Sequence, residues 1–331
     1  MKRAIELFVV VAIAAALPVT VARAEDGSRQ DKGALSEANK FFERGNKFVQ
    51  EGSLARAKQE YEKALKIYPK HLDALYNLAI ACERLGQKGE AIDDYRRYLD
   101  IKGNDPDAWT QLGLLYDDVG SKSEARHAYE KALEVDPKFG RAHHNLGVLL
   151  KEQGDLKAAE THLAAFVKLE EQAGRPAGDA YYSLGILYLQ ELRDKEAKAA
   201  MQKAIDTDPS VPYFNNAMGD IYLFEKRPDL SIVYYQKAVE KDPKYAPAYS
   251  GLGDAYAQLK DPDKALSSYR KALQLRPDYA LVYYKLGLLY ADSNPAEAIK
   301  QFEKYLESGK TPQYRDEVAA KIEALKLSLK H

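Results

Sequence analysis

The strongest constraint on the fold of this 331-residue chain is a pattern that returns every 34 residues. The stretch from Trp109 to Pro137 shows one copy. It contains two runs in which apolar residues stand three or four positions apart, the spacing that places them on one face of a helix. Gly120 separates the two runs, so the sequence predicts two amphipathic helices that fold back on each other as a hairpin.

One hairpin buries too little apolar surface to fold alone, so neighbouring copies are expected, and they are present in register on both sides. Each copy carries a small residue at one position of its first helix, here called the small-residue position. It carries a ring or another large apolar side chain at one position of its second helix, here called the ring position. The small-residue position holds Gly45, Ala79, Gly113, Gly147, Gly185, Gly219, Gly253 and Gly287. The ring position holds Tyr61, Tyr95, Tyr129, Leu163, Met201, Tyr235, Tyr269 and Phe302.

The copy that starts at residue 106 resembles the tetratricopeptide repeat in the order of its packing residues. Those residues are Trp109, Leu112, Gly113, Tyr116, Ala125, Tyr129, Ala132 and Pro137. The resemblance implies an all-α fold, a right-handed superhelical α-solenoid of about eight helix-turn-helix repeats over residues 38–309. By this register the repeats start at residues 38, 72, 106, 140, 178, 212, 246 and 280. The period lengthens once, from 34 to 38 residues in the fourth repeat, where a longer loop or an extended helix is expected.

Residues 1–24 have the three parts of a secretory signal peptide: Lys2 and Arg3, an apolar run, and the small-residue site Ala22-Arg23-Ala24. We expect cleavage after Ala24, with an uncleaved membrane anchor as the alternative. No cysteine follows the apolar run, so a bacterial lipoprotein is not predicted. Residues 25–33 are polar and are predicted to form a tether. These features predict an exported bacterial protein, periplasmic or secreted, that contacts a membrane only if the signal segment stays uncleaved.

The C-terminal segment, residues 313–331, is predicted to form a capping helix. Its apolar residues stand three or four positions apart, so they form one stripe that can cover the exposed face of the last repeat. They are Tyr314, Val318, Ile322, Leu325 and Leu329.

Composition and motifs argue against an enzyme, a cofactor and a nucleic-acid partner. Lys and Arg number 49 against 50 Asp and Glu, a balance that does not favour a nucleic-acid-binding surface. The sequence contains no Gly-rich phosphate loop, nucleophile elbow, paired zinc cysteines or His-Glu-x-x-His motif. The single cysteine, Cys82, takes the helix-face position of Tyr116 in the next repeat, so a buried, unreactive thiol is expected.

Four of the six histidines fall in repeats three and four: His127, His143, His144 and His162. His143 takes the position that holds Trp109 in the previous repeat, so it is expected to pack. A metal site would need three of these side chains to converge, and we do not predict one.

The family resemblance implies that the first helix of each repeat lines a concave groove in which partner proteins bind. Side-chain amides there can bond a partner's main chain, and rings can supply apolar anchors. Carried over by register, the candidate partner-binding residues are Asn46, Tyr76, Asn77, Gln111, Arg141, His144, Asn145, Tyr182, Tyr213, Asn216 and Phe224. We expect the rings of Tyr182, Tyr213 and Phe224 to stand outside the core. The alternative is a polar face that contacts only solvent.

One specialised groove, the carboxylate clamp of chaperone-binding family members, is not predicted. The resemblance would require a Lys and an Asn in one repeat, an Asn in the next, and a Lys and an Arg in the third. The matching positions hold Phe42 and Asn46, then Asn77, then Asp107 and Gln111. Both asparagines match, but all three cations are missing.

The sequence therefore predicts a non-enzymatic protein-binding scaffold of the bacterial cell envelope. It would hold a partner protein, an extended peptide or a helix during assembly, secretion or surface-polymer export. The alternative is an accessory subunit of a polysaccharide synthesis or export system that contacts glycan as well as protein. Neither the partner nor the oligomeric state follows from the sequence.

Overall fold

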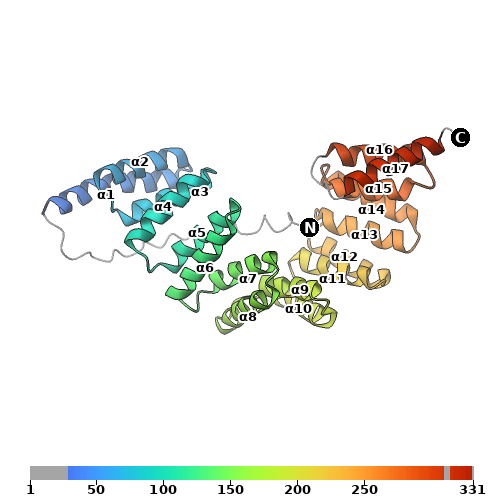
Figure 1. The fold of residues 1–331 in the computed structure, drawn as a ribbon, viewed down its shortest axis with the longest axis horizontal. Helices are drawn as coiled ribbons and strands as arrows, with labels where there is room; N and C mark the ends of the chain where they lie inside the picture. Colours follow the sequence, from blue (N-terminus) through green and yellow to red (C-terminus); the bar gives the residue numbers. More distant parts are fainter. Residues whose placement is uncertain (1–28, 309–313, 330–331) are drawn as a thin grey trace. The chain divides into compact units, whose positions relative to one another are not determined.

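The computed structural model describes residues 29–308 and 314–329, and within these ranges the ordered elements are α-helices (Figure 1). The chain divides into two compact units, with the boundary inside helix α5 between Leu115 and Tyr116. The helices up to this boundary are α1 (Arg29–Gln50), α2 (Leu54–Ile67), α3 (Leu72–Arg84), α4 (Lys88–Ile101) and α5 (Pro106–Asp118). The second unit contains α6 (Lys122–Val135), α7 (Gly140–Gln153), α8 (Leu156–Gln172), α9 (Gly178–Gln190), α10 (Asp194–Thr207), α11 (Pro212–Phe224), α12 (Pro228–Lys241), α13 (Ala246–Gln258), α14 (Pro262–Leu275), α15 (Ala280–Tyr290), α16 (Pro295–Glu307) and α17 (Arg315–Ser328).

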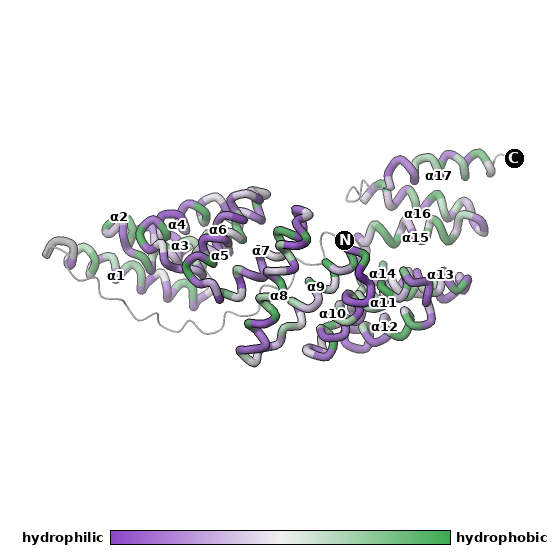
Figure 2. Tube along the Cα trace, turned by 60° about the horizontal axis from the view of Figure 1, so that its bottom comes forward, coloured by the Kyte–Doolittle hydropathy of each residue, from purple (hydrophilic) through white to green (hydrophobic). Residues whose placement is uncertain are grey.

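Within each unit the helices stack in chain order as an α-solenoid. The helix pairs α1–α2, α7–α8 and α13–α14 form hairpins, and the second helix of a hairpin packs on the first helix of the next. Figure 2 shows hydrophilic and hydrophobic residues alternating along individual helices, as expected when one face of each helix packs and the other meets solvent. None of the described helices is both long and apolar enough to cross a lipid bilayer.

The helices lie at the positions of the sequence pattern except at the N-terminus. Helices α3, α5, α7, α9, α11, α13 and α15 begin at residues 72, 106, 140, 178, 212, 246 and 280. Helix α1 begins at Arg29, so residues 29–33 are helical, and the prediction that they form a tether is wrong. This segment has no proline, and its one glycine costs a helix only about 1 kcal/mol, so nothing stops α1 from extending. The predicted signal peptide, residues 1–24, lies outside the described residues.

The two helices of a hairpin approach closely where the small-residue position meets the ring position. A Cβ atom added at Gly45 would lie 2.4 Å from the Tyr61 ring, and one added at Gly253 would lie 2.3 Å from the Tyr269 ring. Both rings are buried, with 1% and 3% of their surface exposed. Glycine allows this close approach in these two repeats, because a Cβ atom there would clash with the ring.

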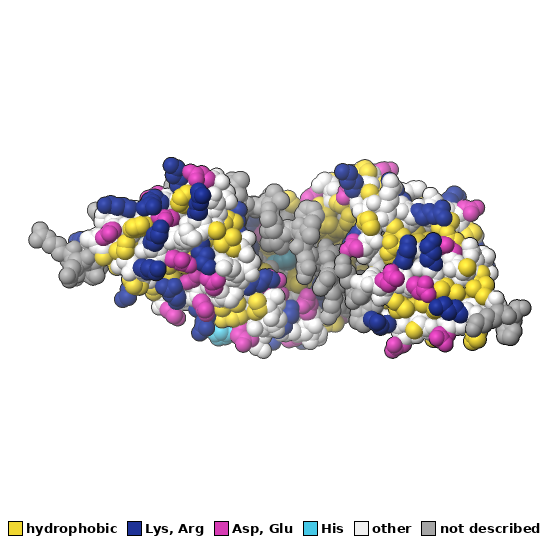
Figure 3. Space-filling model, turned by 90° about the horizontal axis from the view of Figure 1, so that it is seen from above, with side chains coloured by type: hydrophobic (Ala, Val, Ile, Leu, Met, Phe, Trp, Pro, Cys, Tyr) yellow, Lys and Arg dark blue, Asp and Glu magenta, His cyan; other side chains and the backbone are white. Residues whose placement is uncertain are grey.

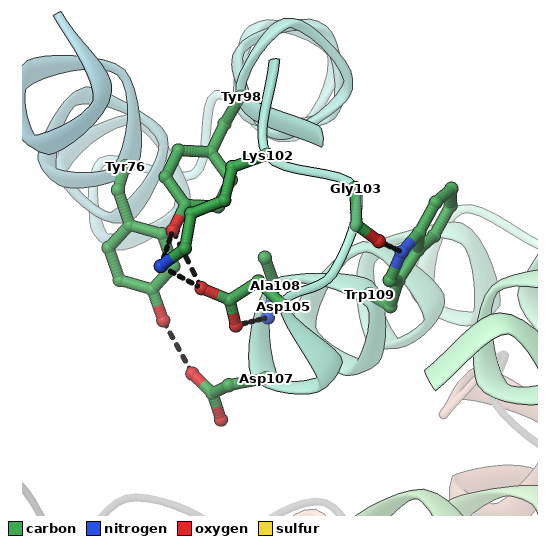
Figure 4. Close-up of polar contacts among 8 residues, drawn as sticks. All are labelled: Tyr76, Tyr98, Lys102, Gly103, Asp105, Asp107, Ala108 and Trp109. Carbon is green, nitrogen blue, oxygen red and sulfur yellow. Dashed lines mark hydrogen bonds and ion pairs between the residues drawn. The ribbon is translucent and has the colours of Figure 1, made fainter. Parts of the chain in front are cut away.

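The residue at the Trp109 position of a repeat stabilises the turn that precedes the first helix. Its polar atom donates a hydrogen bond to the backbone carbonyl six residues earlier, as Figure 4 shows for Trp109 and Gly103. The four such bonds are Trp109 Nε1 to Gly103 (2.8 Å), His143 Nε2 to Pro137 (3.0 Å), Tyr249 OH to Pro243 (3.3 Å) and Tyr283 OH to Pro277 (3.0 Å). Trp, His and Tyr thus make the same hydrogen bond at this position. His143 packs at the Trp position as predicted.

The turn inside each of the first seven hairpins has a left-handed residue at one position. In the first four repeats this residue is glycine, with φ between 75° and 84° at Gly52, Gly86, Gly120 and Gly154. In the next three repeats the backbone has the same form, with φ of 59° to 60°, but the residues are Leu192, Lys226 and Lys260. These three positions carry backbone strain, because a Cβ atom disfavours this conformation.

Helix α17 packs on α16 at the end of the second unit. Val318 and Ile322 are buried against Phe302 and Tyr305, and Leu325 is partly buried there. Leu329, by contrast, is 54% exposed, so the apolar stripe covers the last hairpin only as far as Leu325.

Candidate functional site

In the first unit, two of the candidate asparagines are bonded to each other. The Asn46 side-chain oxygen accepts a hydrogen bond from the Tyr61 hydroxyl (2.8 Å) and one from Asn77 Nδ2 (3.1 Å). Burial raises the pKa of Tyr61 to about 12, so the hydroxyl stays a donor at neutral pH. Asn46 therefore anchors a core tyrosine, and its oxygen is already engaged within the chain.

Tyr76 is held in place by its neighbours. Its hydroxyl bonds to the Asp107 carboxylate, as Figure 4 shows. Its ring lies 5.2 Å from the Tyr98 ring and 5.6 Å from the Tyr95 ring. Burial raises the pKa of Tyr76, and the charge of Asp107 adds to the shift. A partner can meet the edge of this ring but cannot reorient it. Gln111, on α5, is half-buried.

Three candidates of the second unit lie on α7. Arg141 is exposed, and Asn145 is half-buried. The His144 ring packs 4.9 Å from the Phe166 ring of α8, and burial lowers the pKa of His144, so it is neutral at physiological pH. His144 is thus a packing residue that offers at most one edge to a partner.

The remaining candidates lie on α9 and α11. The Tyr182 and Tyr213 rings meet edge to face at 5.1 Å, and the Tyr213 hydroxyl donates to the Asp179 carboxylate. Tyr182 also packs against the buried cluster of Met201, Ala217, Met218 and Ile221. The expectation that all three rings stand outside the core therefore fails for Tyr182. Phe224 does stand out, with 76% of its surface exposed.

Models of known protein families match this chain along most of its length. Models described as tetratricopeptide repeat match residues 42–107, 146–212, 106–139, 128–161, 234–267 and 213–245, and a model described as TPR repeat matches 253–294. Together they cover residues 42–294 without a gap. The chain belongs to the tetratricopeptide repeat family. No curated protein matches it.

Solved structures of several other proteins share the fold. Yeast Tom70 has a TM-score of 0.64 and 17% identity, over 94% of this chain and 67% of its own. A chain of the APC/C hetero-tetramer Cut9-Hcn1 has a TM-score of 0.59 and 21% identity, and the match spans 82% of this chain but only 52% of that one. A tetratricopeptide repeat protein from Parabacteroides merdae has a TM-score of 0.54 and 17% identity, over 88% of this chain and 99% of its own.

Three aspartates on the first helices of these tetratricopeptide repeats were missed by the sequence analysis: Asp179, Asp220 and Asp254. Asp220 accepts hydrogen bonds from the Tyr235 hydroxyl (2.6 Å) and from Asn216 Nδ2 (3.1 Å). Burial raises the pKa of Tyr182 to about 12, and the charges of Asp220 and Asp179 add to the shift. Asp179 is bonded to the candidate ring of Tyr213, and Asp220 is bonded to the candidate amide of Asn216.

Asp254 occupies the position of Asp220 one repeat later. It accepts a hydrogen bond from the Tyr269 hydroxyl (2.7 Å) and forms an ion pair with Lys285 (2.5 Å), whose ammonium also bonds to Ser250 (2.9 Å). The signal that could have found Asp220 and Asp254 is their place directly after the glycine of the small-residue position. The acceptor and its tyrosine lie 15 residues apart on different helices, so the packing pattern of one helix does not reveal the hydrogen bond between them.

No group of three metal-ligating side chains comes together among the described residues. His143 and His162 do meet, with 3.0 Å between their Nδ1 atoms. Since His143 Nε2–H donates to a carbonyl, its Nδ1 is the acceptor and His162 Nδ1–H is the donor. The pair links α7 and α8 as a structural contact. On the face drawn in Figure 3, positive side chains lie interspersed with negative ones.

Proposed function

We propose that this protein is a non-enzymatic scaffold that holds a partner peptide or helix against the first helices of its tetratricopeptide repeats. Membership of a protein-binding repeat family supports the general role. The observation that carries the proposal is the surface of α9 and α11. There Phe224, the last residue of α11, exposes 76% of its surface. Exposed rings of this kind serve as anchors in protein interfaces.

The cellular setting is part of the same proposal. The signal-like residues 1–24 support export to the bacterial envelope, where the partner would take part in assembly, secretion or surface-polymer export. In the second candidate function, an accessory subunit that contacts glycan, the same rings would bind the sugar. A glycan needs open ring faces to stack on, but Tyr182 and Tyr213 meet edge to face. We therefore favour a protein partner.

A capture experiment with matched variants tests the role. The chain without residues 1–24 is immobilised and exposed to envelope extract, and the partner that it recovers is then titrated against wild type and two variants. We expect Phe224→Ala to weaken binding by about 5- to 30-fold, because a ring anchor is worth roughly 1–2 kcal/mol.

The control is Val233→Ala, which removes an exposed apolar side chain from the second helix α12. It should bind like wild type. Equal loss in both variants, or no loss in Phe224→Ala, would show that the first-helix surface is not where the partner sits. Circular dichroism establishes that both variants fold.

A further inference from the structure

One polar arrangement occurs three times in the repeats. In it, the residue directly after the small-residue position accepts a hydrogen bond from the tyrosine at the ring position of the same repeat. We call this residue the acceptor. The three pairs are Asn46 with Tyr61 (2.8 Å), Asp220 with Tyr235 (2.6 Å) and Asp254 with Tyr269 (2.7 Å). In each pair the acceptor stands on a first helix, and the tyrosine is buried on the second.

In two of the three cases the following repeat supplies a further donor to the same acceptor. Asn77 donates to Asn46 across 3.1 Å, and Lys285 pairs with Asp254 across 2.5 Å. Asn77 and Lys285 occupy the same position of their repeats, because each lies 31 residues after its acceptor. The donor matches the acceptor in charge: an amide faces an amide, and an ammonium faces a carboxylate.

The third arrangement lacks a donor from the following repeat, and among the described residues its second carboxylate oxygen accepts a hydrogen bond only from the uncharged Asn216 amide of the same helix (3.1 Å). The residue 31 positions after Asp220 is Gly251, which has no side chain to offer. A Cβ atom there would lie 2.4 Å from the Tyr235 ring, so the ring itself keeps the position empty of a side chain. No Lys, Arg or His of the described chain forms an ion pair with Asp220, and Asp220 is exposed. The cation that acts on it from a distance, Lys285, is in contact with Asp254.

We propose that a basic side chain of the bound partner, lysine or arginine, pairs with Asp220 and takes the place that Lys285 takes at Asp254. This inference rests on the proposed function and names the chemistry of its partner. Asp179, on the neighbouring first helix α9, adds a second carboxylate, which accepts a hydrogen bond from the Tyr213 hydroxyl. The Tyr182 and Tyr213 rings can contact the alkyl stem or the cation itself. The surface therefore fits a segment with a basic residue rather than an acidic one.

The experiment uses a displayed library of random 12-residue peptides as the probe. The chain without residues 1–24 selects binders, and each selected peptide is then made with its basic residue changed to Gln. Both peptide forms are titrated against wild type and Asp220→Asn. The variant removes the charge but keeps an oxygen that can accept the Tyr235 hydroxyl, and thermal unfolding checks that it folds. Glu240→Gln, an exposed carboxylate on α12, is the control for net charge.

We expect selected peptides to carry Lys or Arg at one common position. Changing that residue to Gln should weaken binding to wild type and to Glu240→Gln about tenfold, and to Asp220→Asn less than about twofold. Peptides that bind without a basic residue, or whose Gln forms lose the same affinity in all three proteins, overturn the inference and leave the scaffold role standing. If no peptide is selected by any form of the protein, both the inference and the proposed function are contradicted.

Discussion

His71 is a buried residue whose protonation state determines whether it can cap a helix. It caps α3: its Nδ1 accepts a hydrogen bond from the Ala74 backbone N–H (3.3 Å), and its Nε2–H donates to the Asn39 side-chain oxygen (2.9 Å). Only the neutral ring can do both, since a second proton would sit on Nδ1 and face the N–H group. Burial lowers the pKa of His71, and the side chain is 4% exposed.

We expect this cap to weaken in mild acid. Because the folded-state pKa lies below the unfolded value of about 6.5, the neutral ring stabilises the fold fully above that value, and the stabilisation is lost as pH falls below it. His71→Asn keeps a capping side chain that does not titrate. Between pH 7.5 and pH 5, wild type should lose about 1 kcal/mol of unfolding free energy relative to this variant, measured by urea denaturation.

The exposed His127 provides the control for the His71 prediction. His127→Asn should track wild type at both pH values. If the difference between wild type and His71→Asn is the same at pH 7.5 and pH 5, then His71 does not couple folding to pH.

Packing residues could be predicted from the sequence, but their hydrogen bonds could not. Cys82 is buried as its position suggested, and burial raises its pKa to about 11, as expected of an unreactive thiol. The role of Asn46, by contrast, depends on a tyrosine 15 residues away and an amide 31 residues away. Local spacing indicates which face a side chain occupies, but not which partner its rotamer reaches, so Asn46 and Tyr182 were assigned to the groove alone.

At the scale of the helix and its turn, three hairpins hold a side chain where the backbone favours glycine. Leu192, 81% exposed and at φ 59°, is the clearest case. Relief of this strain is measurable because the side chain makes little packing contact that a substitution could disturb.

We expect Leu192→Gly to raise the free energy of unfolding by about 0.5–1 kcal/mol, since glycine adopts the left-handed region freely. The matched variant is Leu192→Ala, which also removes the exposed side chain but keeps the Cβ atom, and it should leave stability nearly unchanged. Thermal and urea unfolding of both variants decides. Equal stabilisation by alanine would assign the effect to the loss of exposed leucine instead of the backbone.

Helix α17 yields a prediction of its own. A chain without residues 313–331 would expose Phe302, Tyr305 and Ile299, which are at most 9% exposed when α17 is in place. We expect self-association or fraying of the last hairpin while the other hairpins stay folded, because each repeat is stabilised by its neighbours. Light scattering and thermal circular dichroism measure the two effects.

A shorter deletion is the control for the α17 prediction. Removal of residues 327–331 leaves Val318, Ile322, Leu325 and the ion pair of Lys326 with Glu303 in place, and the apolar side chains that it takes away, such as Leu327, are exposed. This chain should behave as wild type. If the longer deletion also stays monodisperse with an unchanged melting profile, α17 does not protect the end of the solenoid.

Element boundaries could be predicted wherever two repeats frame them, but not at the start of the chain. The repeated turn and the inter-repeat proline mark both ends of a helix in every internal copy. Before the first repeat there is no preceding copy to compare, so the polar composition of residues 25–33 suggested a tether. Polarity alone does not prevent a helix, and α1 begins at Arg29.

At the scale of the whole molecule, the proposed export makes a prediction about the chain's first residue. In a bacterial host the protein should be found in the envelope fraction with Glu25 as its N-terminus, because Ala22 and Ala24 match the small-residue pattern that signal peptidase requires. Intact-mass spectrometry of the purified protein measures this. Recovery of a chain that keeps residues 1–24 in the membrane fraction would instead support the anchor alternative.

The position of the Tyr235 ring has a mechanical consequence. The ring lies against Gly219 of its own hairpin and against Gly251 of the following one, and a Cβ atom at either glycine would come within 2.6 Å or 2.4 Å of it. The fully buried ring therefore packs against both neighbouring hairpins. The two hairpins cannot move apart unless the ring leaves its packing site. When force is applied to the two ends of the chain, the packing contact between α11 and α13 should be among the last to break.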